Sequence, residues 1–190
     1  MSTITAHLTA EQFAQQYADV PFRELVRGEV VELMPGGLLH SQISGQAYYA
    51  LQTWARQTRL GRAYTNETGL ITGRDPDTVR GADVAYFSFR RLPAGRQPTG
   101  FSDVPPELVV EVVGKGQGWD AMLEKAGEYL TMGVSRVWVL DPPSETLHIL
   151  RRDARPVELS GDAVVSDEAV LPGFSCRVSE FFQDITPKAE

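Results

Sequence analysis

The stretch Leu108-Val109-Val110-Glu111-Val112-Val113 is aliphatic at every position except Glu111. A short, continuous apolar run of this kind is typical of a strand that is buried on both faces in the centre of a sheet. The glycine-rich segment 114–118 ends the run, residues 119–132 read as a helix that stops at Gly133, and residues 134–140 form a second apolar strand. This strand–helix–strand unit predicts a parallel pair of strands joined by a right-handed crossover.

The sequence on either side of this unit predicts a mixed α/β architecture. Thr9 and Gln12 have the spacing of a capping box, which predicts a short helix near the N-terminus. After Ser41, apolar residues recur every three or four positions, as in a helix that ends at Gly61. We further expect a hairpin at 24–33, strands at about 62–72, 78–88 and 107–113, edge strands at 146–150 and 157–159, and a short helix at 178–182.

The composition indicates a globular protein and excludes several other classes. A chain of 190 residues with 42% hydrophobic residues is expected to form one globular domain. The single cysteine, Cys176, excludes an internal disulfide framework and a cysteine-based zinc site, and we expect it to be a small packing residue. The sequence has no run of about 20 apolar residues that could span a bilayer. It has no signal-peptide pattern either, so we expect a cytoplasmic protein without membrane association.

Two acids stand inside apolar strands. Asp83 lies in Gly81-Ala82-Asp83-Val84-Ala85-Tyr86-Phe87, and Glu111 lies in the aliphatic run quoted above. A carboxylate in the centre of a sheet is costly to bury unless it is paired or bound to a metal. On adjacent strands the two acids would present the oxygen ligands that Mg²⁺ prefers, and the metal would orient water and neutralise charge on a phosphodiester. Taken alone, either acid could instead be a strand-end residue that pairs with an arginine.

The chain has fifteen arginines and only three lysines, two of which follow Glu111 closely. Lys115 keeps the strand parity of Glu111, although Gly114 and Gly116 would interrupt the strand. Lys125 lies inside the predicted helix, from which its side chain could lean back over the end of the sheet. Either ammonium could position water or stabilise charge that develops in the transition state. Each could equally be a solvent-facing lysine.

The chain contains a series of short motifs, spread from about residue 8 to residue 182. They are Gly28-Glu29-Val30-Val31, Met34-Pro35 and His40; Ala82-Asp83-Val84-Ala85; Pro105 to Val112; Asp120, Lys125 and Tyr129; Gly133-Val134; Trp138 to Pro142; and Leu171-Pro172-Gly173-Phe174. In these motifs the chain resembles the Uma-two family, restriction-endonuclease-like proteins of the PD-(D/E)XK superfamily. Two positions depart from the family pattern: Ala82 stands where proline is usual, and Gly114-Lys115 replaces a usual Ser-Pro.

The resemblance implies an α/β (α+β) fold with a restriction-endonuclease-like αβββαβ core. The mixed central sheet would be flanked by helices and preceded by an N-terminal hairpin, within one domain of residues 1–190. This order of elements agrees with the one read from the residues themselves.

The resemblance also implies a site. Asp83 and Glu111 would be catalytic residues that bind Mg²⁺ or Mn²⁺. In the superfamily a lysine usually stands two residues after the acid, where this chain has Val113. The family resemblance points to Lys125 as the catalytic lysine instead, while Lys115 stays an alternative from its place after Glu111. Further residues expected to line the site are Glu29, His40 and Lys115.

Three functions are open at this point. The leading interpretation is a Mg²⁺-dependent endonuclease with nucleic acid, expected to be DNA, as its substrate. The alternative is a weak or inactive nuclease fold that serves as an interaction module, as a homodimer, and a third is a hydrolase of smaller phosphorylated substrates. The net charge of −7 favours the interaction module, because proteins that bind phosphate backbones usually carry a basic surface. Eight arginines from Arg56 to Arg96 could form a local basic patch or a solvated surface.

Overall fold

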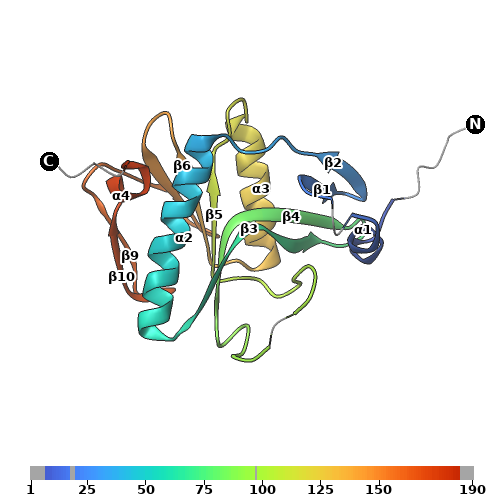
Figure 1. The fold of residues 1–190 in the computed structure, drawn as a ribbon, viewed down its shortest axis with the longest axis horizontal. Helices are drawn as coiled ribbons and strands as arrows, with labels where there is room; N and C mark the ends of the chain where they lie inside the picture. Colours follow the sequence, from blue (N-terminus) through green and yellow to red (C-terminus); the bar gives the residue numbers. More distant parts are fainter. Residues whose placement is uncertain (1–6, 18–19, 97, 185–190) are drawn as a thin grey trace, which may run out of the picture.

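The structure is a computed structural model, and it describes residues 7–17, 20–96 and 98–184. Within these residues an eight-stranded sheet carries helices on both faces (Figure 1). The helices are α1 (Ala10–Tyr17), α2 (Leu38–Thr58), α3 (Trp119–Met132) and α4 (Ser179–Phe182). None of these helices is long and apolar enough to cross a membrane. The strands are β1 (Arg23–Val26), β2 (Glu29–Glu32), β3 (Gly61–Gly73), β4 (Thr78–Ser88), β5 (Leu108–Val112), β6 (Arg136–Asp141), β7 (Thr146–Leu150), β8 (Val157–Ser160), β9 (Val164–Asp167) and β10 (Leu171–Arg177).

β5 occupies the centre of the sheet, as its aliphatic sequence predicts. In the described part of the chain the strand order is β2-β1-β4-β5-β6-β7-β8, and β3 pairs with β4. Every residue of β5 is buried. β5 and β6 are parallel, whereas the other neighbours in this sheet are antiparallel. The order α2-β3-β4-β5-α3-β6 confirms the predicted αβββαβ core with its parallel strand pair.

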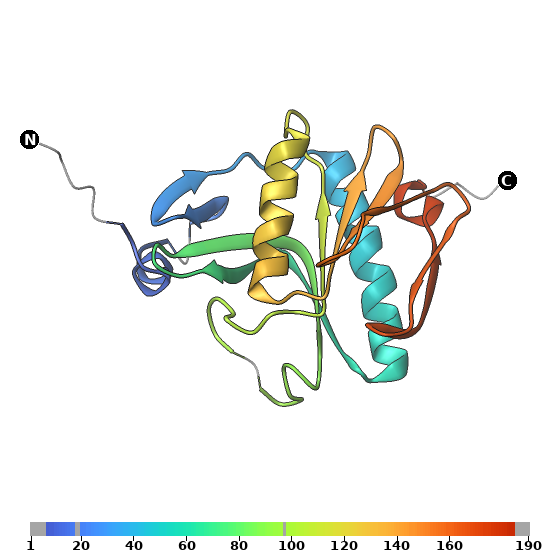
Figure 2. The ribbon, with the colours of Figure 1, turned by 180° about the vertical axis from the view of Figure 1, so that it is seen from behind.

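α2 and α3 cover opposite faces of the sheet, as the two opposite views show (Figure 1, Figure 2). Residues of β5 divide between two cores because side chains along a strand point alternately to the two faces. Leu108, Val110 and Val112 pack in the core that contains the buried side chains of α2 and β10, whereas Val109 packs with those of α3. Glu111 has the parity of Val109 and therefore points toward α3.

The predicted N-terminal elements are confirmed. Thr9 N donates to Oε1 of Gln12 over 2.8 Å, and Gln12 N donates to Oγ1 of Thr9 over 3.2 Å, so the capping box forms. β1 and β2 pair antiparallel around Gly28, whose φ of +82° suits the tight turn. Near the other end of the chain, Cys176 is buried in the core against α2, as predicted.

Three details of the sequence-based prediction are wrong. α2 begins at Leu38 rather than at Ser41, because Leu38 and Leu39 are exposed and lie outside the apolar stripe that signals the helix. β7 is not an edge strand, since it lies between β6 and β8. The antiparallel pair β9–β10 has no predicted counterpart, because Pro172 and Gly173 within β10 read as a turn.

The arginines from Arg56 to Arg96 do not form one patch. Arg62 lies opposite Phe87 at one end of the long β3–β4 pair. Arg74 and Arg80 lie at the other end, where β3 turns into β4. Leu70, the partner of Arg80, is eight residues along β3 from Arg62, so at least about 26 Å of strand separates the two groups.

Candidate active site

Asp83 and Glu111 lie opposite each other where β4 and β5 separate. The antiparallel pair Val84↔Val110 places Asp83 across from Glu111, one step further along the register. The backbone ladder ends at Val84, and the N–H of Val112 donates instead to Oδ2 of Asp83 over 2.7 Å. The two strands therefore part at this point, and both carboxylates line the cavity that opens there.

Both oxygen atoms of Glu111 accept a hydrogen bond from α3. Oε1 accepts from the hydroxyl of Tyr129 over 2.7 Å, and Oε2 accepts from the ammonium of Lys125 over 3.0 Å. Lys125 and Tyr129 are four residues apart, so they share the face of α3 that packs on the sheet. The helix therefore fixes the position of the Glu111 carboxylate.

The Lys125 ammonium is held by three oxygen atoms. Besides its contact with Glu111, it donates to the carbonyl of Gly81 over 2.8 Å and lies 3.2 Å from Oε1 of Glu24. An ammonium has three N–H donors, so these contacts can occupy all of them. The Lys125 side chain is only 12% exposed, which rules out the solvent-facing alternative.

Buried ion pairs surround this lysine. Arg80 donates to Oε2 of Glu24 over 2.9 Å and to both oxygens of Glu128 over 2.7 and 2.8 Å. The N–H of Gly81 donates to Oε1 of Glu24 over 2.9 Å. Burial acts to raise the pKa of Glu24, but the charges of Lys125 and Arg80 outweigh it and hold that pKa below its ordinary value. Glu24 is thus a charged, fully paired group that links β1 to β4 and α3.

His40, in the first turn of α2, reaches Asp83. Its Nε2 lies 3.3 Å from Oδ2 of Asp83. This hydrogen bond, opposed by partial burial, raises the pKa of His40 above its ordinary value. Gly36 makes room for the ring, since a Cβ there would come within 2.7 Å of Nδ1 of His40. The start of α2 therefore supplies a cationic partner for Asp83 below the raised pKa.

Glu67 reaches the site through a bulge in β3. The register of the β3–β4 pair shifts here, and Asn66 and Glu67 have φ of +68° and +55°. The bulge lays the Glu67 side chain over Gly81, where a Cβ would collide with its Oε2. Burial and then the charge of Asp83 raise the pKa of Glu67 above its ordinary value. Glu67 is thus an acid near Asp83 with a weakened tendency to ionise.

One cavity of about 480 Å³ brings these groups together. Its lining includes Asp83, Glu111 and Lys125, and also His40 and Lys115 from the sequence-based prediction. Lys115 is exposed at the rim, in the loop between β5 and α3. Five of the six residues expected at the site thus share one space.

Glu29 is the sixth, and the structure places it outside this cavity. It is exposed on β2, opposite Val26, and lines a separate pocket with His7 and Pro76. β1 rather than β2 pairs with β4, so the hairpin acid that reaches the cavity is Glu24 on β1.

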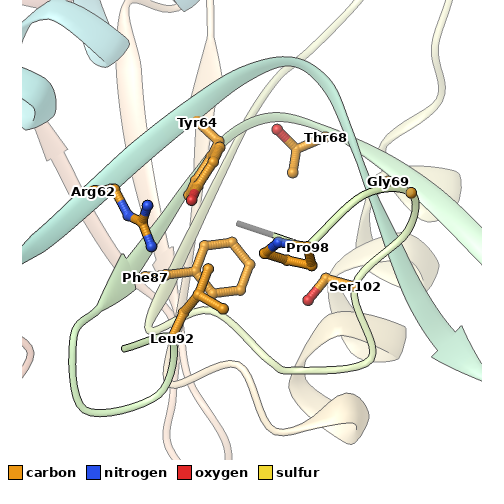
Figure 3. A pocket seen from close by; sticks show the side chains of 9 residues that line it. Arg62, Tyr64, Thr68, Gly69, Phe87, Leu92, Pro98 and Ser102 are labelled. Atoms are coloured by element: carbon orange, nitrogen blue, oxygen red, sulfur yellow. The ribbon is translucent and has the colours of Figure 1, made fainter. Parts of the chain in front are cut away.

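A different cavity, of about 430 Å³, extends along β3 from Arg62 to Gly69 (Figure 3). Its lining is aromatic and aliphatic around one guanidinium, with Arg62, Tyr64, Phe87 and Leu92 as the main walls, and none of its lining residues is an acid. The guanidinium of Arg62 is held by two backbone carbonyls. Without acids or a free cation this cavity lacks the groups for acid–base or metal chemistry, so the cavity around Asp83 is the candidate active site.

The Uma2 family model, described as "Putative restriction endonuclease", matches residues 10–179. The match covers most of the chain. The chain belongs to the Uma2 family. The search of curated proteins finds no match. A crystal structure from Anabaena variabilis, of a protein described as a putative nuclease belonging to DUF820, has the same fold: the TM-score is 0.79 at 20% sequence identity, over 92% of this chain and 97% of that chain.

The donor set of this Uma2 chain fits a hard divalent cation with few protein ligands. Within the described residues, the hydrogen bonds and the ion pair of the Asp83 side chain all involve Oδ2, and Oδ1 accepts none. The described residues contain no cluster of three or more His, Cys, Asp or Glu side chains that could enclose a metal. Mg²⁺ is commonly bound by one or two carboxylates, and water and substrate phosphates complete its octahedral shell. Asp83 and Glu111 match that pattern rather than a closed structural zinc site.

Burial raises the pKa of Glu111 to about 8, against the opposing charge of Lys125 and with a contribution from Asp83. A carboxylate must be deprotonated to bind a metal, so a proton and a cation would compete for Glu111 near neutral pH.

The sequence-based prediction missed Glu24, Glu67, Arg80 and Tyr129 as site residues. Glu24 carries a signal of the same kind as Asp83, an acid next to aliphatic residues in a predicted strand. Tyr129 lies four residues after Lys125 on the predicted helix, and this spacing puts both on one face. Glu67 carries no such signal in this Uma2 sequence, because its place depends on a bulge that alternating patterns do not reveal.

Proposed function

We propose that this chain is a Mg²⁺-dependent endonuclease that hydrolyses phosphodiester bonds of nucleic acid, with DNA as its substrate. The observation that carries the proposal is the convergence of Asp83, Glu111 and Lys125 on one cavity at the centre of the sheet. The description of the Uma2 family, "Putative restriction endonuclease", supports the proposal. The protein of the same fold from Anabaena variabilis is likewise described as a "putative nuclease".

In this proposal Asp83 and Glu111 hold the cation. A bound Mg²⁺ supplies charge neutralisation at a phosphodiester and an activated water. Tyr129 and Lys125 orient Glu111 through one hydrogen bond to each oxygen, and His40 with the Val112 N–H orients Asp83. Carboxylates held in this way need little rearrangement when the reaction begins, which is the main source of electrostatic catalysis.

Lys125 assists from a constrained position. Its three N–H donors face Glu111, Gly81 and Glu24, and the contact with Glu24 is the longest at 3.2 Å. To contact a substrate phosphate directly, the ammonium must give up one of these three acceptors. Glu24 is the acceptor that can be released most easily, because it also accepts hydrogen bonds from Arg80 and from the N–H of Gly81. We therefore assign Lys125 two roles. The first is to position the Glu111 carboxylate, and the second is to stabilise the negative charge that develops on the phosphate.

The deciding experiment measures cleavage of supercoiled, linear and single-stranded DNA in Mg²⁺ or Mn²⁺ by the wild type, Asp83→Asn and Glu111→Gln. Loss of a metal ligand removes several kcal/mol of transition-state stabilisation, so each variant should lose roughly a thousandfold in rate. Glu29→Gln is the matched control, because it removes an acid from the neighbouring hairpin that does not line the cavity. It should cleave like the wild type.

Titration calorimetry with Mn²⁺ separates the outcomes. Binding by the wild type that Glu111→Gln loses, together with cleavage, supports the proposal. Metal-independent cleavage, or cleavage equal in all variants, contradicts it. Mn²⁺ binding without cleavage of any nucleic acid would favour a hydrolase of smaller phosphorylated substrates, and neither binding nor cleavage would favour an interaction module.

A further inference from the structure

A second cavity adjoins the candidate active site. It has a volume of about 660 Å³, within the range of about 300–1,000 Å³ typical of ligand sites. Its wall is shared with the active-site cavity along the start of α2 and the loop before α3, through His40, Gly114, Lys115 and Gln117. A ligand that spans the shared wall would have one part beside Asp83 and Glu111 and another part in this second space.

The far wall of this adjoining cavity is apolar. Trp119, the first residue of α3, is 38% exposed, and its ring lies 4.6 Å from the ring of His148, which fixes its place. Pro142 and Pro143, after β6, and Leu38, at the start of α2, continue this wall, and Leu38 is 92% exposed. One acid, Asp141 at the end of β6, also lines the cavity, and its Oδ2 accepts a hydrogen bond from the Ser144 hydroxyl over 2.7 Å. Flat aromatic and aliphatic walls of this kind suit an uncharged ring system rather than a row of phosphates.

The cations near the two cavities are few. Arg80 is paired with Glu24 and Glu128, Lys125 with Glu24 and Glu111, and His40 with Asp83. That leaves Lys115, in the wall that both cavities share, as a cation without an ion pair within the described residues.

Arg27, whose side chain is 72% exposed, lies beside the active-site cavity but is paired over 3.0 Å with Glu124, which lines it. The exposed arginines of α2 lie far from these cavities. Arg56 and Arg59 are at the C-terminal end of α2, whereas His40 is in its first turn. An α-helix rises about 1.5 Å per residue, so the two ends of this helix are roughly 30 Å apart. A duplex seated at the cavities would meet one free cation and several carboxylates there, instead of the basic rows that duplex phosphates require.

We propose that the adjoining cavity is a subsite for an unpaired nucleobase of the substrate strand. The base stacks on Trp119 between Leu38 and the two prolines, while Lys115 contacts the phosphate that joins this nucleotide to the one at Asp83 and Glu111. The substrate class is then single-stranded nucleic acid, or a strand whose bases are locally unpaired. This inference rests on the proposed function, because it names the kind of substrate that the same site takes.

The experiment is a titration of metal-free protein in EDTA with a fluorescein-labelled single-stranded deoxyoligonucleotide, and with the same strand annealed to its complement. Tryptophan emission is followed beside anisotropy. Of the three tryptophans, Trp54 and Trp138 are buried, so a base that stacks in the cavity quenches the emission of Trp119. We expect the single strand to bind at least about tenfold more tightly than the duplex, with quenching, since stacking on one aromatic ring is worth about a factor of ten or more.

Four variants sharpen the test. Trp119→Ala should weaken single-strand binding about tenfold, whereas Trp119→Phe keeps a stacking ring and should bind like the wild type without the quenching. Leu38→Glu places a negative charge at the cavity rim, on a residue too exposed to affect folding, and should also weaken binding. Tyr49→Ala is the matched control, because Tyr49 is 69% exposed on α2 but lines a different groove. It should leave the affinity unchanged.

Equal affinity for single strand and duplex, wild-type affinity in both Trp119→Ala and Leu38→Glu, or binding of neither form would overturn the inference. Failure of the proposed function looks different. A single-strand preference that depends on Trp119, with no metal-dependent cleavage, would leave the subsite standing and remove the nuclease. The opposite outcome is metal-dependent cleavage that requires Asp83, is equally fast on single strand and duplex, and is unchanged in Trp119→Ala. It would support the nuclease and remove the subsite.

Discussion

The ammonium of Lys125 lies 3.0 Å from Oε2 of Glu111, although the two residues belong to different elements, α3 and β5. Position 113, two residues after Glu111 on the strand side, carries a valine and supplies no cation. α3 crosses the face of the sheet toward which Glu111 points. The positive charge beside Glu111 therefore comes from Lys125 on this helix and not from the strand. The cation and the acid thus depend on the packing of α3 against β5, which links the stability of the fold to the geometry of the candidate site.

The first prediction concerns this lysine. Lys125→Ala leaves the buried carboxylates of Glu111 and Glu24 without their shared cation, and breaking a buried pair typically costs about 3–5 kcal/mol. The free energy of unfolding, measured by urea denaturation, should fall by about that amount. Lys115→Ala is the control: an exposed lysine at the rim should change stability by less than about 0.5 kcal/mol. In cleavage assays Lys125→Ala should also lose more turnover than Lys115→Ala, and the reverse ranking would transfer the catalytic role to Lys115.

The second prediction concerns Asp83. Asp83→Asn can keep the hydrogen bond from the Val112 N–H, because an amide oxygen also accepts. It removes a negative charge beside Glu111, which relieves acid–acid repulsion. We expect an intact or slightly more stable fold by thermal unfolding, with Mn²⁺ binding abolished in calorimetry. Unchanged Mn²⁺ affinity in this variant would remove Asp83 from the metal site.

Much of this arrangement follows from sequence patterns. The aliphatic run around Glu111 predicts a central strand, and an acid within a run of that kind predicts a site, because an unpaired carboxylate is too costly to bury there. Lys125 is predicted to lie on a helix that crosses back over the sheet. In each case the pattern is local, and the burial it implies is confirmed.

The remaining features depend on tertiary pairing. Glu24 and Glu29 both lie in the hairpin, and which of them reaches the cavity is decided by the pairing of β1, not β2, with β4. Glu67 reaches the site through a bulge whose backbone has positive φ, which neither residue type nor alternation signals. The three acceptors of Lys125 come from three strands, so no single segment of sequence could reveal them.

The third prediction is a pH dependence of stability in metal-free protein. The pKa of Glu111 is raised by burial from 4.5 to about 8. Its contribution to stability is therefore fully present below about 4.5 and is lost as the pH rises through about 8. The free energy of unfolding of the wild type in EDTA should fall over this window relative to that of Glu111→Gln. Parallel curves for the two proteins would mean that Glu111 does not titrate in this window.

The fourth prediction concerns the hydroxyl of Tyr129. It donates to Oε1 of Glu111 over 2.7 Å, and both groups are buried. Tyr129→Phe leaves that carboxylate oxygen without its donor, so the free energy of unfolding should fall by about 1–3 kcal/mol. The lost hydrogen bond had opposed the rise in the pKa of Glu111, so this pKa should rise further. A proton then competes more strongly with the cation, and Mn²⁺ affinity at neutral pH should fall while recovering at higher pH.

A double-mutant cycle separates this effect from a simple packing loss. In the Glu111→Gln background the acceptor is a neutral amide, so Tyr129→Phe should cost less than it does in the wild type, by about 1 kcal/mol. Tyr49→Phe, on the exposed face of α2, supplies the control for loss of a phenolic hydroxyl. If Tyr129→Phe costs the same in both backgrounds and Mn²⁺ affinity keeps its wild-type pH profile, the hydroxyl acts through packing alone, and the positioning of Glu111 rests on Lys125.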